Sequence, residues 1–304
     1  MTKKEKIEQS NYLINIYSGI LCLNQTFEEG NSTNITYNFD CPEFLALKEK
    51  YSLDKIAGKG SEFKKAKRLL HYLAPRLTHS PWYDNHIPCN AIDLMDYSLN
   101  NPKQGINCLN KSKILQECCL ALRIYARRIV ILPYSPFDFD CHVVTEIYDG
   151  KLKKWIMLDP TTDGFFVNEN RIPLSLLEIR ETFANAKFVT FVKSSDSLKD
   201  LTKLKNKYVE HNAYICKNIF MFCVDQDSTF GTTERKLHFI PMNFSTKQSQ
   251  FANITYRIAN LPEKHKHLLP MYEDALNALQ SQEEEERTNI ELMCNVPYDY
   301  TYFK

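Results

Sequence analysis

Residues 104–162 constrain the fold of this chain more than any other stretch, because their hydrophobic pattern changes from helical to strand-like within a short distance. Apolar side chains in 109–122 recur at helical spacing, which predicts an amphipathic helix with one buried face. The apolar run at 129–132 ends at a proline and favours a strand. Residues 141–148 and 155–158 are strand-like and are separated by Asp-Gly, a common hairpin turn. The stretch therefore predicts a helix, a strand and a hairpin.

Three side chains of this stretch can act together. Cys108 stands at the expected start of the helix, where unpaired backbone N–H groups and the helix dipole favour a thiolate. His142 opens the first strand of the hairpin, and Asp159 closes the second. A type II′ turn at Gly150-Lys151 would place His142 directly opposite Asp159. We therefore expect the imidazole and the carboxylate to stand side by side on one face of the sheet.

A thiol, an imidazole and a carboxylate in this order form the nucleophile, base and orienting group of a catalytic triad. Each residue taken alone has a commoner structural explanation, but their order and expected register together favour catalysis. Cys141 is the competing nucleophile, yet on a strand its side chain would point away from the face of His142, so we expect it in the core. Glu146 would share the face of His142, either as a further partner or as an outward-facing charge.

Four short motifs occur in series: Gly105 three residues before Cys108, IYAR at 124–127, HVVTE at 142–146 and DPT at 159–161. They resemble the G-x-C, G-I-P-A-R, H-A-W-x-E and D-P-T motifs of the transglutaminase-like superfamily of cysteine enzymes, in its bacterial form. This superfamily is related in architecture to papain-like proteases. The resemblance implies an α+β fold in which an N-terminal cysteine helix packs on an antiparallel sheet, with flanking α/β extensions. It also implies Cys108, His142 and Asp159 as the catalytic triad.

The chain departs from the superfamily pattern at three positions. Arg123 replaces the usual glycine, and Val144 replaces the usual tryptophan. The loss of that tryptophan weakens the expectation of a dry channel for an amine, which favours hydrolysis over crosslinking. Asn107 directly precedes Cys108 and is a candidate contributor to the oxyanion site.

The segment 78–104 is rich in turn formers and aromatic residues and precedes the cysteine. Trp82 is its foremost candidate for the substrate cleft, because an indole N–H can donate to a developing oxyanion. Gln104 is the rival donor, since cysteine acyl-transfer enzymes often carry a glutamine shortly upstream of the nucleophile. Other aromatic and imidazole side chains could line the same cleft or fill a small core of their own: His79, Tyr83 and His86.

Composition excludes several classes of protein. Hydrophobic residues make up 43% and charged residues 25% of the 304 positions, which is typical of globular proteins. The 38 basic and 37 acidic side chains balance, so there is no basic footprint for nucleic acid. No uninterrupted apolar segment resembles a signal peptide or a membrane span, and we expect a cytoplasmic protein that does not bind membranes.

Metal and cofactor sites find little support in the sequence. None of the ten cysteines forms a C-x-x-C pair, which argues against structural zinc and suits a reducing compartment. An alternative metal site that lacks ligand spacing would use Cys41, Cys89, Cys141 and His142. Crosslinking members of the superfamily need calcium, but no acidic loop has calcium-ligand spacing. We expect no metal and no cofactor.

The flanking regions predict an N-terminal extension at 1–62, a catalytic core at 63–194, and strands with a terminal helix at 195–304. Capped helices are expected from Ser61, Asn90 and Ser175, the last with a capping box to Glu178. A further helix is expected at 41–49 and the final one at 272–291. Further strands are expected at 14–23, 34–39, 165–167, 219–224, 236–244 and 253–258.

These observations predict thiol-dependent acyl transfer at an amide of a peptide or protein, through a thioester. Hydrolysis is the expected outcome, as in a peptidase, amidase or deamidase. A crosslinking transglutaminase is the alternative. A protein that keeps the fold and only binds or scaffolds is the alternative of another class. The sequence leaves the identity of the substrate and the oligomeric state open.

Overall fold

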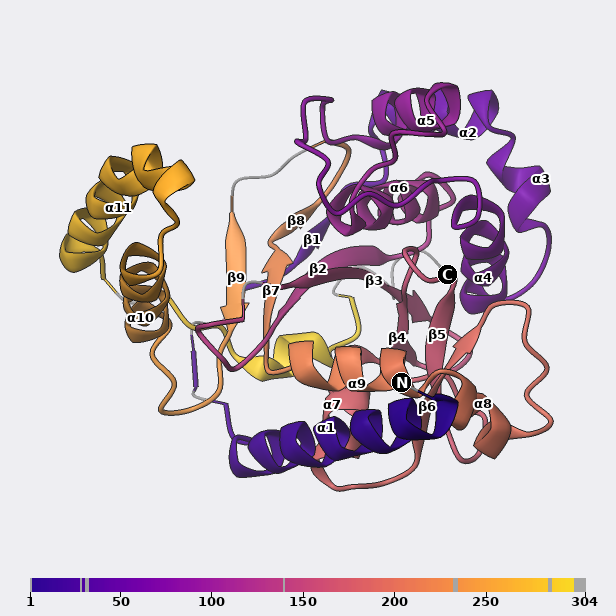
Figure 1. The fold of residues 1–304 in the computed structure, drawn as a ribbon. Coiled ribbons are helices and arrows are strands. Elements are labelled where there is room, and N and C mark those ends of the chain that lie inside the picture. Colours follow the sequence, from indigo (N-terminus) through magenta and orange to yellow (C-terminus); the bar gives the residue numbers. More distant parts are fainter. Residues whose placement is uncertain are drawn as a thin grey trace.

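A five-stranded antiparallel sheet forms the centre of the fold (Figure 1). The computed structural model describes residues 2–27, 29–30, 33–138, 140–231, 235–283 and 286–297. In spatial order the strands are β4 Lys154–Leu158, β3 His142–Asp149, β2 Ala126–Leu132, β7 Met221–Asp225 and β9 Lys236–Phe239. Two smaller pairs are β1 Thr36–Tyr37 with β8 Asp227–Ser228, and β5 Gly164–Asn168 with β6 Val189–Lys193.

Helices cover both faces of the sheet (Figure 1). On one face, the helix α6 Cys108–Ala121 lies against β2 and β3, and other helices surround it: α2 Pro42–Lys50, α3 Leu53–Ala57, α4 Glu62–Leu73 and α5 Ala91–Asn100. On the other face lie α1 Lys3–Leu23, α7 Leu176–Ala184 and α9 Val209–Asn218, with α8 Leu201–Lys207 beside β6. Each layer encloses its own hydrophobic cluster. The fold is therefore mixed α+β, as predicted.

The C-terminal segment contributes to the central sheet as well as to its surroundings. Strands β7 and β9 follow residue 195, yet they extend the sheet that begins in the 63–194 segment. Beyond β9, two helices pack on each other, α10 Thr246–Ala259 and α11 Leu269–Ser281. The 3₁₀ helix η1 Glu263–Leu268 connects them, and a second one, η2 Ile290–Met293, follows α11. The segments 63–194 and 195–304 thus share one sheet, whereas strand β1 of the segment 1–62 pairs, within the described part of the chain, only with β8. Among the described residues, no helix combines the length and apolar character that a membrane crossing requires.

The predicted capped helices are confirmed. Ser61 accepts a hydrogen bond from the backbone N–H of Lys64 at the start of α4, and Asn90 caps α5 in the same way. Ser175 and Glu178 form the expected capping box of α7. The helix predicted at 41–49 is α2, with Pro42 in its first turn.

Two predicted strands are helices. The segment 14–23 belongs to α1, because Ile14, Tyr17 and Leu21 recur at helical spacing and pack into the second hydrophobic cluster. The segment 253–258 belongs to α10, which begins after the cap residue Ser245. The helix predicted at 272–291 ends at Ser281 as α11, and its positions 284 and 285 lie outside the described residues.

The prediction that the cysteine helix is amphipathic is wrong. Residues 110–120 of α6 are all buried, because helices and the sheet enclose α6 on every side. Lys113 and Glu117 form an ion pair of 3.0 Å inside the protein. In the sequence these charged residues have the spacing of a solvent-facing stripe, and only the tertiary contacts show that they are buried.

The register of the hairpin also differs from the prediction. The turn between β3 and β4 contains four residues, 150–153, and pairs Asp149 with Lys154 and Thr145 with Leu158. This register brings Asp159 level with Val144, two residues away from His142. Side chains alternate between the two faces of a strand, so a shift of two residues preserves the face. His142 and Asp159 are therefore diagonal neighbours on the same face.

Candidate active site

Cys108 is the first residue of α6. The side-chain Oδ1 of Asn107 accepts a hydrogen bond of 3.2 Å from the backbone N–H of Asn110 and so caps the helix. Gly105 makes the turn before the cap with φ of 71°, and a Cβ there would lie 2.9 Å from the carbonyl oxygen of Thr78. This tight turn places the thiol at the positive end of the helix dipole.

The imidazole of His142 and the carboxylate of Asp159 are in direct contact. His142 Nε2 lies 2.9 Å from Asp159 Oδ2, and both side chains are buried. Asp159 Oδ1 accepts hydrogen bonds from the backbone N–H groups of Thr161, at 2.9 Å, and Thr162, at 3.4 Å. Because Nε2 faces Asp159, Nδ1 is the nitrogen of His142 that remains for its hydrogen bond with Cys108.

The electrostatics of the cluster favour an ion pair between thiolate and imidazolium. Burial alone would raise the pKa of Cys108, but hydrogen bonds with His142 and His79 outweigh it and lower the pKa to about 6. Burial alone would lower the pKa of His142, but Asp159 and Cys108 raise it to about 10. Asp159 is also buried, and its pKa is held well below the usual range by His142 and His211. These opposite shifts favour a Cys108 thiolate beside a His142 imidazolium at neutral pH.

The cluster opens into a cavity of about 460 Å³. This volume suits a side chain or a short peptide segment of a substrate. The wall contains several groups able to donate or accept hydrogen bonds: His79, Asn107, Cys141, Thr161, His211 and Tyr214. A nucleophile, a base and an orienting carboxylate thus share one accessible cavity, an arrangement capable of acyl transfer.

Three of the four predicted cleft candidates lie elsewhere. The side chain of Trp82 is 92% exposed, and Trp82 does not line the cavity. Gln104 is exposed and accepts a hydrogen bond of 2.5 Å from the hydroxyl of Tyr97. Glu146 is fully buried, forms an ion pair of 2.6 Å with Arg127 and accepts from the backbone N–H of Leu176. Neither expectation for Glu146 is met, since it links β2, β3 and the start of α7.

Asn107 does line the cavity, but its side-chain amide is occupied. Its Oδ1 caps α6, and its Nδ2 donates to Asn85 Oδ1 at 3.0 Å. Tyr83 and His86 pack in a small core of their own and do not line the cavity, since the centroids of their rings lie 5.2 Å apart. His79, by contrast, lines the cavity and helps to lower the pKa of Cys108.

The prediction that Cys141 lies in the core is wrong. Strand β3 begins at His142, so the alternation of side chains does not extend to Cys141, which is exposed and lines the cavity. Although the residue is exposed, the cavity wall partly desolvates its thiol, and this, together with the nearby Cys108 and Asp140, raises the pKa of Cys141. It is therefore mostly protonated at neutral pH and a weaker nucleophile than Cys108.

Sequence reasoning missed two residues of the site, His211 and Tyr214 of α9. His211 Nε2 lies 3.4 Å from Asp159 Oδ2, and the ring of Tyr214 lies 5.5 Å from that of His142. In the sequence, their segment resembles a lysine-rich boundary between two parts of the chain. The one feature that could have indicated them is their i, i+3 spacing, which places both rings on one side of a helix.

The alternative metal site is not formed. Cys41 Sγ lies 3.2 Å from Thr229 Oγ1, and Cys89 Sγ lies 3.5 Å from Arg128 Nη1, so neither joins Cys141 and His142. Over the part of the chain that the structure describes, no three His, Cys, Asp or Glu side chains are arranged to hold a metal ion. Comparisons of the chain with protein-family models, with curated proteins and with solved structures found no match.

Proposed function

We propose that this protein is a thiol-dependent enzyme that transfers acyl groups from an amide of a peptide or protein. The observation that carries the proposal is that Cys108 and His142 line one open cavity, with His142 held at 2.9 Å from the buried carboxylate of Asp159. The lowered pKa of the Cys108 thiol is consistent with this role. We also assign the core to the papain-like and transglutaminase-like architecture. Three placements support this assignment: the thiol stands at the first residue of α6, the imidazole at the first residue of β3, and the carboxylate at the residue directly after β4.

In the first half of the proposed reaction, Cys108 Sγ attacks the carbonyl carbon of the amide. The C–S bond forms, the C–N bond breaks, and the imidazolium of His142 gives its proton to the departing amine or ammonia. The N–H of Asn110 is taken by the cap, but the backbone N–H groups of Cys108 and Leu109 at the start of α6 have no intrahelical acceptor and can stabilise the negative oxygen of the tetrahedral intermediate. Asp159 keeps the imidazole in one orientation throughout.

In the second half, neutral His142 takes a proton from water, which attacks the thioester and releases the acid and the Cys108 thiolate. Hydrolysis is preferred over crosslinking because a buried valine, Val144, replaces the tryptophan that the amine channel of crosslinking enzymes would need. The preferred activities are those of a peptidase, an amidase or a deamidase.

The experiment incubates the full chain with dimethylated casein, an unstructured glutamine-rich protein that serves as the substrate. Hydrolysis releases ammonia or creates new amino termini, whereas crosslinking incorporates the fluorescent amine monodansylcadaverine. Cys108→Ala should abolish turnover, and the matched control Cys141→Ser should retain it. Before any substrate is known, Cys108 should react with iodoacetamide at pH 6 well ahead of the other nine thiols. Equal reactivity of all ten would overturn the proposal in favour of a non-catalytic scaffold.

A further inference from the structure

The helix α9 brings a second imidazole to the carboxylate of Asp159. His211 Nε2 lies 3.4 Å from Asp159 Oδ2, the same oxygen that contacts His142. The ring of His211 is fixed by aromatic neighbours, because it meets Phe191 edge-on at 4.2 Å and stacks on Phe166 at 6.1 Å. Its orientation toward the carboxylate is therefore set by packing and not by the carboxylate alone.

The surroundings of Asp159 explain what a second donor does. Oδ1 already accepts two backbone N–H groups, and Oδ2 faces the two imidazoles. A buried carboxylate is costly to keep ionised unless donors surround it. When His142 gives its proton to a leaving group, Asp159 loses its cationic neighbour. A donor on α9 would keep the carboxylate charged and in place until His142 is protonated again.

Two further residues of α9 hold the neighbouring part of the site. The ring of Tyr214 meets that of His142 at 5.5 Å and 70°. Lys217 Nζ lies 2.7 Å from Asp138 and 3.3 Å from Asp140, which directly precede β3. His211, Tyr214 and Lys217 recur every three residues, so one side of α9 faces Asp159, His142 and the segment before His142.

We propose that His211 is a positioning residue: its buried Nε2 forms no hydrogen bond with the described residues in this structure but lies 3.4 Å from Asp159 Oδ2, and it serves as the donor that keeps this carboxylate ionised and aligned with His142 during the reaction. The inference rests on the proposed function, because it concerns the same triad. Charged and titratable groups that face this cluster are His142, His211, Lys111 of α6, and on the cysteine side His79, Cys141 and Asp140. Of these groups, only His211 changes in the variants.

The test measures the second-order rate of iodoacetamide alkylation of Cys108 against pH, by mass spectrometry on the full-length chain. His211→Phe keeps a ring for Phe166 and Phe191 but removes the donor. It should shift the inflection of the profile upward by about one pH unit, because the pair that stabilises the thiolate is weakened. His211→Gln places an amide donor near the position of Nε2 and should return the inflection toward that of the wild type.

A profile of His211→Phe that coincides with the wild type would overturn the inference, and so would a profile of His211→Gln equal to that of His211→Phe. If His211→Phe does not fold, His211→Asn serves as the variant without a donor at Nε2, compared with His211→Gln. The proposed function is tested separately, by whether Cys108 of the wild type reacts selectively at all. If Cys108 of the wild type reacts no faster than the other thiols, the proposed function is wrong. If Cys108 reacts selectively but the His211 variants keep the pH profile of the wild type, only the role of His211 is wrong.

Discussion

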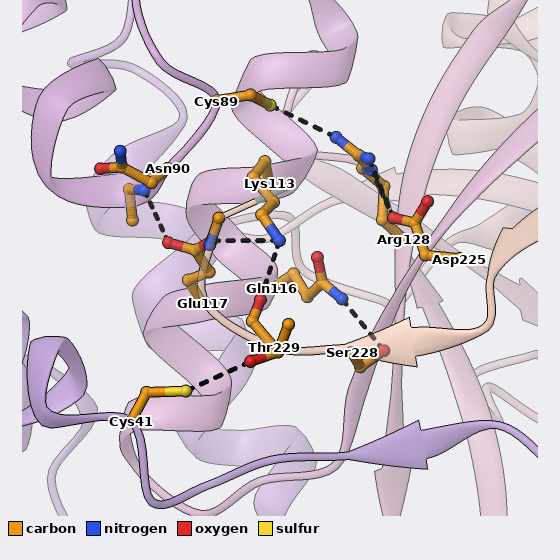
Figure 2. A network of polar contacts seen from close by, with 12 residues as sticks. Cys41, Cys89, Asn90, Lys113, Gln116, Glu117, Arg128, Asp225, Ser228 and Thr229 are labelled. Carbon is orange, nitrogen blue, oxygen red and sulfur yellow. Dashed lines mark hydrogen bonds and ion pairs between the residues drawn. The ribbon is translucent and has the colours of Figure 1, made fainter. Parts of the chain in front are cut away.

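Helix α6 carries two polar clusters that differ in what surrounds them. At its first residue, Cys108 joins His142 and Asp159 beside an open cavity. Further along the same helix, Lys113 and Glu117 form an ion pair inside the protein (Figure 2). Figure 2 shows that this second cluster lies between α5, α6 and the segment after β7.

Every oxygen of the second carboxylate has a partner. Glu117 Oε2 accepts from the backbone N–H of Ala91 at 2.6 Å, and Oε1 accepts from that of Gly231 at 2.8 Å. Lys113 Nζ also donates to the carbonyl oxygen of Thr229 at 2.9 Å. Burial raises the pKa of Glu117 in spite of Lys113. With its donors and acceptors paired inside the protein, this cluster holds three segments together.

The contrast teaches that buried charge alone does not identify a functional site. Both clusters are buried and contain an ion pair, but only the first combines a reactive group, a perturbed pKa that favours its ionised form, and access to solvent. The second is a structural ion pair of a kind that apolar side chains could often replace. Loss of a residue from the first cluster should therefore affect chemistry, and loss of a residue from the second should affect stability.

The largest effect is expected from Cys108→Ala, which removes the nucleophile. Turnover of the amide substrate should fall by about 10³-fold or more, while the thermal unfolding midpoint changes little. Steady-state rates and differential scanning calorimetry give both numbers. Cys141→Ser, in the same cavity, is the control and should keep most of the activity. Comparable losses in the two variants would contradict the assignment of the nucleophile.

The next largest effect concerns stability and belongs to the closed cluster. Glu117→Ala leaves Lys113 buried without its counter-charge, which should lower the free energy of unfolding by about 3–5 kcal/mol. Urea denaturation followed by circular dichroism measures this change. The exposed pair Lys4–Glu8 supplies the control, because Glu8→Ala should cost less than about 1 kcal/mol. If the double variant Lys113→Met, Glu117→Leu is no more stable than Glu117→Ala, the unpaired charge is not the cause.

A smaller effect is expected in the pH dependence of the open cluster. Alkylation of Cys108 should accelerate as the pH rises through about 6, where the thiolate forms. In His142→Ala, burial still raises the pKa of the thiol but the hydrogen bond is lost. Each unit of that increase lowers the thiolate fraction tenfold below the pKa, so the rate at pH 6 should fall by about tenfold or more. The exposed Cys22 in the same sample is the internal standard, and an unchanged profile for Cys108 would refute the pairing with His142.

The parts of the site that sequence could predict are local in the chain. The helical spacing of the apolar residues after Cys108 placed it at a helix start, and the hairpin placed His142 and Asp159 on one face. The error of two residues in the register did no harm, because parity and not exact opposition decides the face. Turn length is set by left-handed residues such as Lys153, which an Asp-Gly signal does not reveal.

The remaining parts depend on contacts between distant segments. His211 and Tyr214 reach the triad because α9 packs between α1 and the sheet, and no pattern near the triad indicates that. Lys113 and Glu117 have the spacing of a solvated helix face, yet segments from both sides of the chain enclose them. Local rules fix caps and periodicity, whereas burial of a charged residue depends on what the rest of the chain brings to it.

The smallest effect is expected for Trp82→Ala, and it is informative because the indole is an attractive candidate from sequence. The side chain is 92% exposed and lies outside the cavity. Its removal should change the free energy of unfolding and the activation free energy by less than about 0.5 kcal/mol, which is about twofold in rate. Loss of a true oxyanion donor would cost about 10²-fold or more. The measurement is the turnover of Trp82→Ala compared with that of Cys141→Ser. A loss of about 10²-fold in Trp82→Ala would contradict the expectation, because it would require the 78–104 segment to close over Cys108 during catalysis.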